Sequence, residues 1–185
     1  MDKLYFALVD TPGIFASLIR RATGLHYIHV VLALDEKLEE AYSVGRRNPA
    51  VPIFAGFEKE ELPRVARTFP RAGYKILSLA CTPEQKHAVR ERLRDCYTRR
   101  FHYHYCLIGL PFILWGKPFY QKRHYTCSSF IARLLEQEGI QWFDKHFSLV
   151  TPRDFFELPG TEVVFEGMIG ELLADTAFGE IAHEP

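Results

Sequence analysis

A cysteine at the start of a predicted helix is the residue in this sequence best suited to chemistry. Cys127 precedes the run FIARLLEQEG (130–139), in which apolar residues recur at the spacing of one buried helix face. Thr126 and Ser128 are alternative N-caps for this helix, and Gly139 is expected to end it. Unpaired N–H groups and the helix dipole stabilise negative charge in a first helical turn, so the Cys127 thiol should ionise readily. Cys127 is therefore a candidate nucleophile.

A cysteine nucleophile needs a base within hydrogen-bonding reach of its thiol. His29 lies inside the apolar run YIHVVLAL (27–34), which is typical of a buried strand. Such a histidine is often only a core or strand-end residue that is satisfied by one backbone hydrogen bond. Because Cys127 occurs in the same chain, we interpret His29 as the candidate general base.

A third polar group usually orients the base, and it should come from the strand that pairs with 27–34. We expect this partner strand at 38–44, after a tight turn at 35–37. If residue 29 pairs with residue 44, Glu40 and Tyr42 share the face of His29. If it pairs with residue 43, Glu39 and Ser43 do. We favour Glu40, because a carboxylate on the more apolar face would be partly buried; a solvated surface charge is the alternative.

Three further residues are candidates for contact with a substrate. The three remaining cysteines are not expected to belong to the site. The substrate-contact candidates are Tyr42, Ser43 and His124. The other cysteines are expected to be buried core thiols, and they are Cys81, Cys96 and Cys106. No CxxC motif is present, and His102 and His104 lack an evident third ligand, so we expect neither a metal nor another cofactor.

The composition excludes several classes of protein. The 185 residues suffice for one domain, which we expect to span 1–185. Lys plus Arg and Asp plus Glu number 23 each, and this zero net charge gives no case for nucleic acid binding. The longest apolar run, 105–115, is too short to span a membrane, so we expect no stable membrane insertion. The N-terminal residues do not resemble a signal peptide, and we expect a cytoplasmic protein of unknown oligomeric state.

The pattern of elements predicts an α+β fold, with an antiparallel sheet packed by helices. The expected strands are 3–9, 27–34, 38–44, 73–80 and 161–167. The expected helices are 10–24, 82–100, the helix that follows Cys127, a short one after Thr151 and Pro152, and a tail helix at 168–179. Residues 45–57, rich in Gly and Pro, are expected to form a long loop. The aromatic run 112–120 is expected in the core or as the wall of a lipophilic substrate groove.

Three features follow one another in this chain. They are a histidine in a strand, a polar residue about a dozen positions later, and a cysteine that opens a helix. In this order, HVVLALDEKLEEAYSVGRRNP (29–49) and YTCSSFIARLLEQEGI (125–140) resemble the circularly permuted NlpC/P60 superfamily. These papain-like hydrolases include the lecithin:retinol acyltransferase-like and YiiX-like proteins. The resemblance extends over roughly residues 3–175 and implies a permuted papain-like fold.

The resemblance also implies a function. Cys127 matches the nucleophile of the superfamily, His29 the base, and Glu40 falls near the third polar position. Such a site cleaves or transfers an acyl group from an amide, ester or thioester through an acyl-enzyme. The substrate would be a small molecule, a lipid or a peptide. The alternative is a catalytically inactive binding or scaffold protein on the same fold, with the loop 45–57 and the aromatics at 112–120 as its recognition surface.

Overall fold

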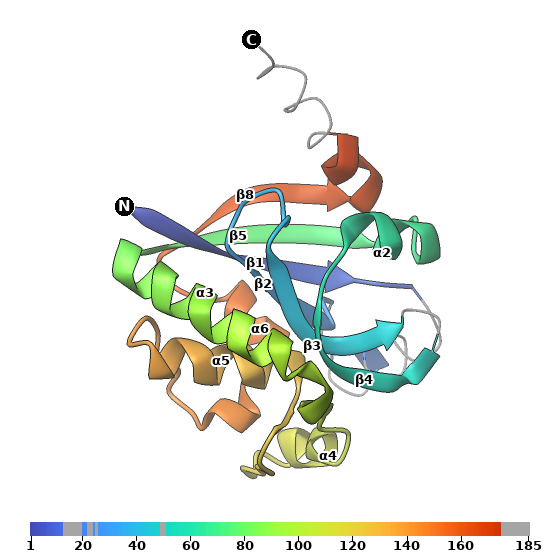
Figure 1. The fold of residues 1–185 in the computed structure, drawn as a ribbon. Helices are drawn as coiled ribbons and strands as arrows, with labels where there is room; N and C mark the ends of the chain where they lie inside the picture. Colours follow the sequence, from blue (N-terminus) through green and yellow to red (C-terminus); the bar gives the residue numbers. More distant parts are fainter. Residues whose placement is uncertain (13–19, 22–23, 25, 49–50, 175–185) are drawn as a thin grey trace.

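An eight-stranded sheet runs through the molecule (Figure 1). The computed structural model describes residues 1–12, 20–21, 24, 26–48 and 51–174. The strands lie in the order β7-β6-β4-β3-β2-β1-β5-β8, and every neighbouring pair is antiparallel except β6 and β7. The strands are β1 (Asp2–Asp10), β2 (His29–Ala33), β3 (Ala41–Asn48), β4 (Val51–Lys59), β5 (Gly73–Cys81), β6 (His104–Tyr105), β7 (His124–Tyr125) and β8 (Thr161–Met168).

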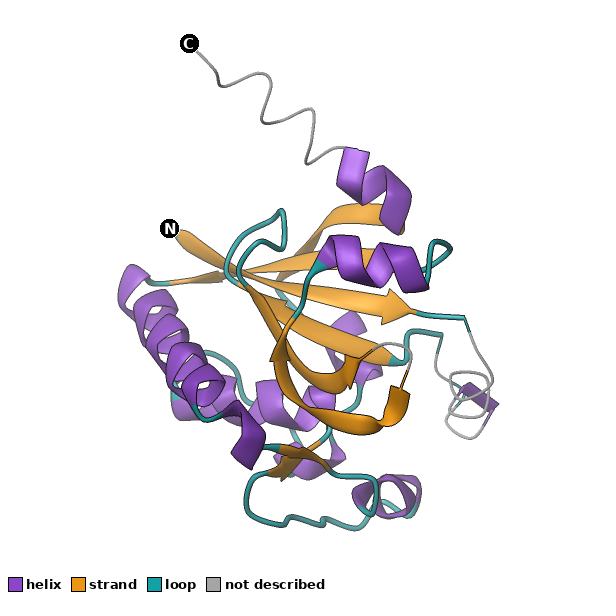
Figure 2. Cartoon of the chain, turned by 45° about the vertical axis from the view of Figure 1, so that its right-hand side comes forward, coloured by secondary structure: helices purple, strands orange, loops and turns teal. Residues whose placement is uncertain are grey.

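Alternating side chains give the sheet two apolar faces, each covered by helices. In β1, Phe6 and Leu8 belong to one buried cluster, whereas Ala7 and Val9 belong to the other. The first cluster includes residues of α3, α5 and α6, and the second includes α2 and the helical residues 169–174 (Figure 2). The helices are α2 (Leu62–Thr68), α3 (Pro83–Thr98), α4 (Gly109–Leu114), α5 (Cys127–Gln137) and α6 (Pro152–Phe156), with 3₁₀ turns η1 (Arg100–His102) and η2 (Phe147–Leu149). The predicted α+β class, with an antiparallel sheet packed by helices, is confirmed.

Several predicted helix boundaries are confirmed, and their capping residues explain them. The Thr82 side chain accepts the N–H of Gln85 at the start of α3, and Gln85 Oε1 accepts the N–H of Thr82 in return. Helix α6 begins after Thr151, as expected. The predicted helix 10–24 falls mostly outside the described residues, and so do residues 175–179 of the predicted tail helix.

The predicted long loop at 45–57 is wrong, because this stretch forms the end of β3 and most of β4. Its glycines are strand residues that admit close neighbours, and Gly45 pairs directly with Gly56. A Cβ atom on Gly56 would lie only 2.4 Å from the carbonyl oxygen of Tyr103. The glycines therefore mark close approach within a sheet here, rather than a turn.

The turn between β2 and β3 is longer than predicted, which changes the register. The Asp35 carboxylate accepts the N–H groups of Glu39 and Glu40, so β3 begins only at Ala41. Leu32 pairs with Tyr42, and a ladder continued in this register would bring residue 29 opposite residue 45. Both predicted registers, 29 with 44 and 29 with 43, are therefore wrong.

Candidate active site

Cys127 lies in the first turn of α5, as predicted, and of the two alternative N-caps the helix uses Thr126, which fixes this turn by a reciprocal cap. The Thr126 side chain accepts the N–H of Ser129 at 3.2 Å, and Ser129 Oγ accepts the N–H of Thr126 at 2.8 Å. The Ser128 hydroxyl donates to the carbonyl of Val150 at 2.5 Å, which ties the same turn to the chain before α6. Gly139, with φ of 64°, follows the end of the helix. Cys127 is thus held in the first turn by buried hydrogen bonds.

The sulfur of Cys127 lies where β2 and β3 separate. Leu34 donates its N–H to Glu40 across this strand pair. Because the N–H groups of alternate strand residues point the same way, that of Val30 also faces the side of β3. The last β2–β3 pair is Leu32 with Tyr42, and the Val30 N–H instead bonds the Cys127 sulfur. The Cys127 sulfur, at the start of α5, therefore accepts the hydrogen bond that β3 would accept from Val30 if the two strands stayed paired.

His29, the first residue of β2, hydrogen-bonds the side chain of Cys127. Two further groups, from β3 and from the residue after β4, contact the imidazole. Its Nε2 lies 3.2 Å from Ser43 Oγ and 3.4 Å from Glu60 Oε1. The Ser43 hydroxyl donates to the same Glu60 oxygen at 2.6 Å. A Cβ atom on Gly45 would lie 2.9 Å from His29 Cε1, so glycine at this position leaves room for the imidazole. The site is therefore a chain of hydrogen bonds from Cys127 through His29 to Ser43 and Glu60.

The electrostatics of this chain favour a charged pair. Burial disfavours the imidazolium form of His29, but the Cys127 and Glu60 side chains outweigh it and raise the His29 pKa to about 10. Burial also disfavours the Cys127 thiolate, yet His29 and the N–H groups of Val30 and Ser128 lower the Cys127 pKa. The Glu60 pKa is lowered too: burial opposes its ionisation, and hydrogen bonds from His29 and Ser43 prevail.

The three other cysteines provide an internal comparison, because all four are buried free thiols. Burial raises the pKa of Cys81, Cys96 and Cys106, as expected for core thiols. Only Cys127 has its pKa lowered, and His29 is the main group that lowers it. The histidine, rather than burial, therefore distinguishes Cys127.

Tyr105 and Arg46 lie near the Cys127–His29–Glu60 site. Burial raises the pKa of Tyr105, and negative charge on Cys127 raises it further, so its hydroxyl stays protonated. Burial lowers the pKa of the Arg46 guanidinium, which interacts with both Glu60 and Tyr105. The Tyr105 side chain is therefore near the thiol, and the Arg46 cation is near Tyr105 and Glu60. Within the described part of the chain, no group of three His, Cys, Asp or Glu side chains could hold a metal ion.

Glu40 does not lie beside His29, and the predicted third member of the site must be corrected. Its carboxylate pairs with Arg90 at 3.0 Å and with Arg94 at 3.8 Å. The reason is the register: Glu40 belongs to the turn that precedes β3. Glu60, which follows β4, occupies the position next to His29 instead.

Of the three predicted substrate contacts, only Ser43 belongs to the hydrogen-bonded site. Tyr42 is buried and stacks on Phe57 in the core. The imidazole of His124 lies beside that of His104, with ring centroids 5.0 Å apart, and its Nδ1 contacts the carbonyl of Lys122. These placements give Tyr42 a packing role and put His124 at the β6–β7 pair.

Sequence reasoning missed Glu60, Gly45 and Tyr105. Glu60 follows β4, a stretch that the sequence predicts as a loop, and the predicted orienting group comes from residues 38–44 instead. The signal available was the continuous run IFAGF (53–57), which has no polar side chain and is compatible with a buried strand that ends before the charged residues 58–61. No signal in the sequence alone places Tyr105 beside Cys127.

Comparisons with known proteins give no family for this chain: no family model, no curated protein and no solved structure matches it.

Proposed function

We propose that the protein is a cysteine hydrolase or acyltransferase that forms an acyl-enzyme on Cys127. One observation carries the proposal. Among the four buried cysteines, Cys127 is the one that bonds a histidine of the described residues, and that histidine is held by the half-buried carboxylate of Glu60. Nucleophile, base and orienting group are the three parts that cysteine-based acyl transfer requires.

The proposed reaction begins with the Cys127 thiolate and the His29 imidazolium. The thiolate attacks the carbonyl carbon of an amide, ester or thioester, a C–S bond forms, and the carbonyl oxygen becomes an oxyanion. The C–X bond to the leaving group then breaks while His29 gives its proton to that group, which leaves a thioester on Cys127. Water or another acceptor next attacks the thioester, His29 takes the acceptor's proton, and the C–S bond breaks to restore the thiolate.

Glu60 and Ser43 act in this proposal by positioning the base. Nε2 of His29 is directed at Ser43 and Glu60, which leaves Nδ1 to face the thiol. The negative Glu60 carboxylate stabilises the imidazolium that exists before attack and again during deacylation. The N–H of Cys127, in the first helical turn, and the Tyr105 hydroxyl are the donors proposed to stabilise the oxyanion.

The arrangement also supports the proposed relation to permuted papain-like hydrolases. A histidine at the start of a strand precedes, in the chain, a cysteine that opens a helix, and the two meet at the point where β2 and β3 separate. We propose this fold relation on the site alone, since the comparisons identify no family.

Acylation by a simple ester tests the function. The protein would be incubated with p-nitrophenyl acetate, and the acetylated residue identified by intact mass and peptide mapping. We expect one acetyl group on Cys127, none there in Cys127→Ala, and acetylation slower by about 10²- to 10⁴-fold in His29→Ala. His87→Ala, which removes an exposed histidine of α3, is the matched control and should behave as wild type. Acetylation of Cys127 at the same rate with and without His29 would overturn the proposal.

A further inference from the structure

A second feature of the molecule, separate from the Cys127 site, is an exposed apolar tip. Eleven large apolar side chains are exposed in the described part of the chain, and six of them fall within residues 101–120. Trp115 is 67% exposed, Ile108 65%, Leu114 54% and Leu107 52%. These four side chains lie on α4 or directly beside it, and we refer to them as the tip. The predicted core position of the aromatic run 112–120 is thus wrong for Trp115.

The tip projects from one end of the molecule. Figure 1 shows α4 at the end farthest from the C-terminus, beyond the sheet and the helices that cover it. The excursion starts after β6 and returns at β7, where His104 pairs with His124 and Tyr105 with Tyr125. Phe112 and Phe119 stack inside the excursion with ring centroids 4.7 Å apart, and the N–H of Phe119 bonds Ser148 Oγ, so the excursion is structured. Exposed apolar groups on a structured projection indicate a surface that is covered by a partner.

The charge of this end identifies the kind of partner. Residues 96–135 contain no Asp or Glu, although the chain as a whole has 23. The same segment carries six basic residues: Arg99, Arg100, Lys117, Lys122, Arg123 and Arg133. Arg99 and Arg100 pair with Asp95 and Glu58, but the other four have no carboxylate partner among the described residues. An uncompensated positive charge therefore borders the tip.

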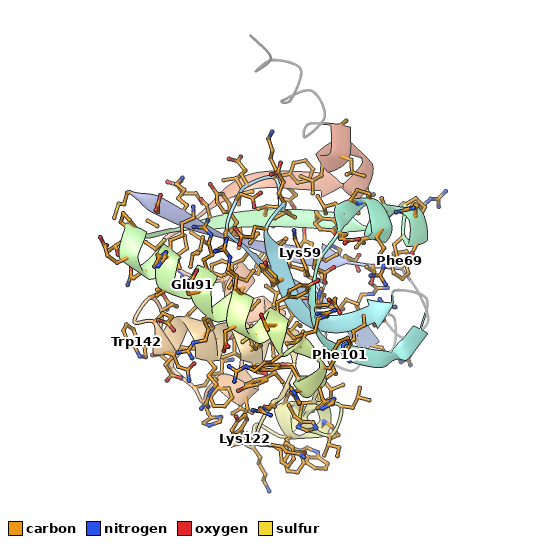
Figure 3. All side chains as sticks on the ribbon, in the orientation of Figure 1. Lys59, Phe69, Glu91, Phe101, Lys122 and Trp142 are labelled. Atoms are coloured by element: carbon orange, nitrogen blue, oxygen red, sulfur yellow. The ribbon has the colours of Figure 1, made fainter. Side chains whose placement is uncertain are left out.

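Part of this charge lines a cavity of about 220 Å³. Lys122, Arg123 and Arg133 contribute to its wall, together with the hydroxyl-bearing rings of Tyr120 and Tyr125. These two hydroxyls lie 3.1 Å apart, and Arg133 is held over the ring of Tyr120. Figure 3 shows Lys122 at the same end of the molecule as α4. Arg92 and Tyr103 also line it, and four basic side chains and three tyrosines around one cavity suit a phosphate group.

We propose that this end of the protein binds the surface of an anionic phospholipid membrane, with the tip entering the boundary between head groups and acyl chains and the basic cavity holding a lipid phosphate. Tryptophan and basic side chains beside exposed aliphatic ones are the composition of interfacial membrane anchors. Nucleic acid would match the basic residues but leave the tip exposed, and a protein partner would not by itself account for the basic cavity beside the tip. None of the helices described here is long and apolar enough to cross a bilayer.

The two tryptophans allow a direct test with the full-length protein. Trp115 lies on the tip, and Trp142, 60% exposed, lies elsewhere on the surface (Figure 3). In Trp142→Phe, the remaining Trp115 reports on the tip; in Trp115→Phe, the remaining Trp142 is the matched control. Each variant would be titrated with vesicles of phosphatidylcholine alone and of phosphatidylcholine mixed with phosphatidylserine. We expect the mixed vesicles to shift the Trp115 emission to shorter wavelength and to leave that of Trp142 unchanged.

Two further sets of variants test whether vesicle binding depends on the basic residues and whether it depends on Cys127. Lys122→Ala/Arg123→Ala in the Trp142→Phe background should weaken binding to the mixed vesicles at least tenfold, and added salt should weaken it in wild type. Cys127→Ser should bind as wild type does, because the proposal does not depend on the chemistry at Cys127. Unchanged Trp115 emission with mixed vesicles would overturn the proposal. So would a concentration-dependent shift without vesicles, which would assign the tip to contact between two copies of the chain.

Discussion

At the scale of single residues, one histidine changes the chemistry of one of four buried thiols. Burial alone raises the pKa of a cysteine, as it does for Cys81, Cys96 and Cys106. Cys127 is as buried as these three, so its lowered pKa depends on His29 and on the N–H groups of Val30 and Ser128. The charge state of Cys127 is therefore a property of the pair.

This dependence predicts the effect of His29→Ala. With the imidazolium removed and burial unchanged, the Cys127 pKa should rise above that of a free thiol and approach those of the other buried cysteines. The pH dependence of iodoacetamide alkylation, followed separately for the four cysteines by peptide mass spectrometry, measures it. In wild type Cys127 should react first at neutral pH, whereas in His29→Ala it should lose that advantage. A Cys127 profile unchanged by His29→Ala would contradict the pairing, and His87→Ala serves as the control.

A comparison of two carboxylates decides the third member of the site. Glu60 contacts His29, whereas Glu40 pairs with Arg90. Glu60→Gln should lower the His29 pKa and slow acetylation of Cys127 at least about tenfold, because a neutral amide no longer stabilises the imidazolium. Glu40→Gln should leave both unchanged. The same alkylation profile and the acetylation rate measure the two variants, and equal effects of both would remove Glu60 from the proposed mechanism.

A glycine beside the imidazole offers a test of packing at the same scale. A Cβ atom on Gly45 would crowd His29, whereas one on Gly73 would lie 3.8 Å from its nearest neighbour, at ordinary contact distance. Gly45→Ala should therefore destabilise the fold by about 1–3 kcal/mol and displace the His29 ring. Gly73→Ala should be nearly neutral. Urea unfolding gives the stabilities and Cys127 alkylation reports the ring position; normal Cys127 reactivity in Gly45→Ala would show that the site tolerates the added methyl group.

At the scale of elements, the start of α5 holds Cys127 in place, and a second helix of the protein serves as its control. Helices α5 and α3 begin with the same reciprocal cap, at Thr126 and Thr82. Each Thr→Ala substitution should cost about 1 kcal/mol, and the buried Thr126 should cost more than the exposed Thr82. Only Thr126→Ala should also slow the alkylation of Cys127. Equal reactivity in both variants would mean that the cap stabilises the helix without orienting the thiol.

The elements also show which parts of the fold follow from the sequence. Helices α3 and α5 were predicted because their caps, first-turn residues and periodicity all lie within a few residues of one another. The hairpin β3–β4 was missed because its glycines serve approaches by Tyr103 and His29, which come from distant parts of the chain. The same long-range dependence explains why Glu60 was missed as the carboxylate beside His29. The turn at Asp35 sets the β2–β3 register, and the pairing of β4 with β3 brings Glu60 to this position.

At the scale of the whole molecule, the candidate site and the apolar tip are neighbours in the chain. The excursion that carries the tip leaves the sheet after Tyr105, which interacts with Cys127, and returns at Tyr125, two residues before Cys127. Binding at the tip would therefore act on segments that border the thiol on both sides. The separate tests of membrane binding and of acylation show whether the two properties depend on one another.

The stability of the whole molecule should depend on pH through the same pair. In the unfolded chain His29 titrates near pH ~6.5 and Cys127 near ~8.5. In the folded protein the His29 pKa is raised to about 10 and the Cys127 pKa is lowered. Between the two unfolded values, both states bind one proton and stability is level. Above ~8.5 the folded state holds one proton more, so stability falls by about 1.4 kcal/mol per pH unit up to pH about 10. Below ~6.5 the unfolded state holds one more, so stability falls as the pH is lowered through the Cys127 pKa.

Urea unfolding of wild type and of His29→Ala/Cys127→Ala, between pH 5 and pH 10, isolates this contribution as the difference between the two profiles. A difference that stays constant with pH would mean that the pKa of neither group is perturbed.

The number of bound protons does not say whether His29 or Cys127 holds the one proton that the pair shares, because a neutral imidazole beside a thiol binds as many protons as an imidazolium beside a thiolate. The ultraviolet absorbance of the thiolate, recorded in the same folded samples, separates the two. We expect it at neutral pH in wild type and its loss in Cys127→Ala, because Glu60 and Ser43 hold the proton on the side of His29.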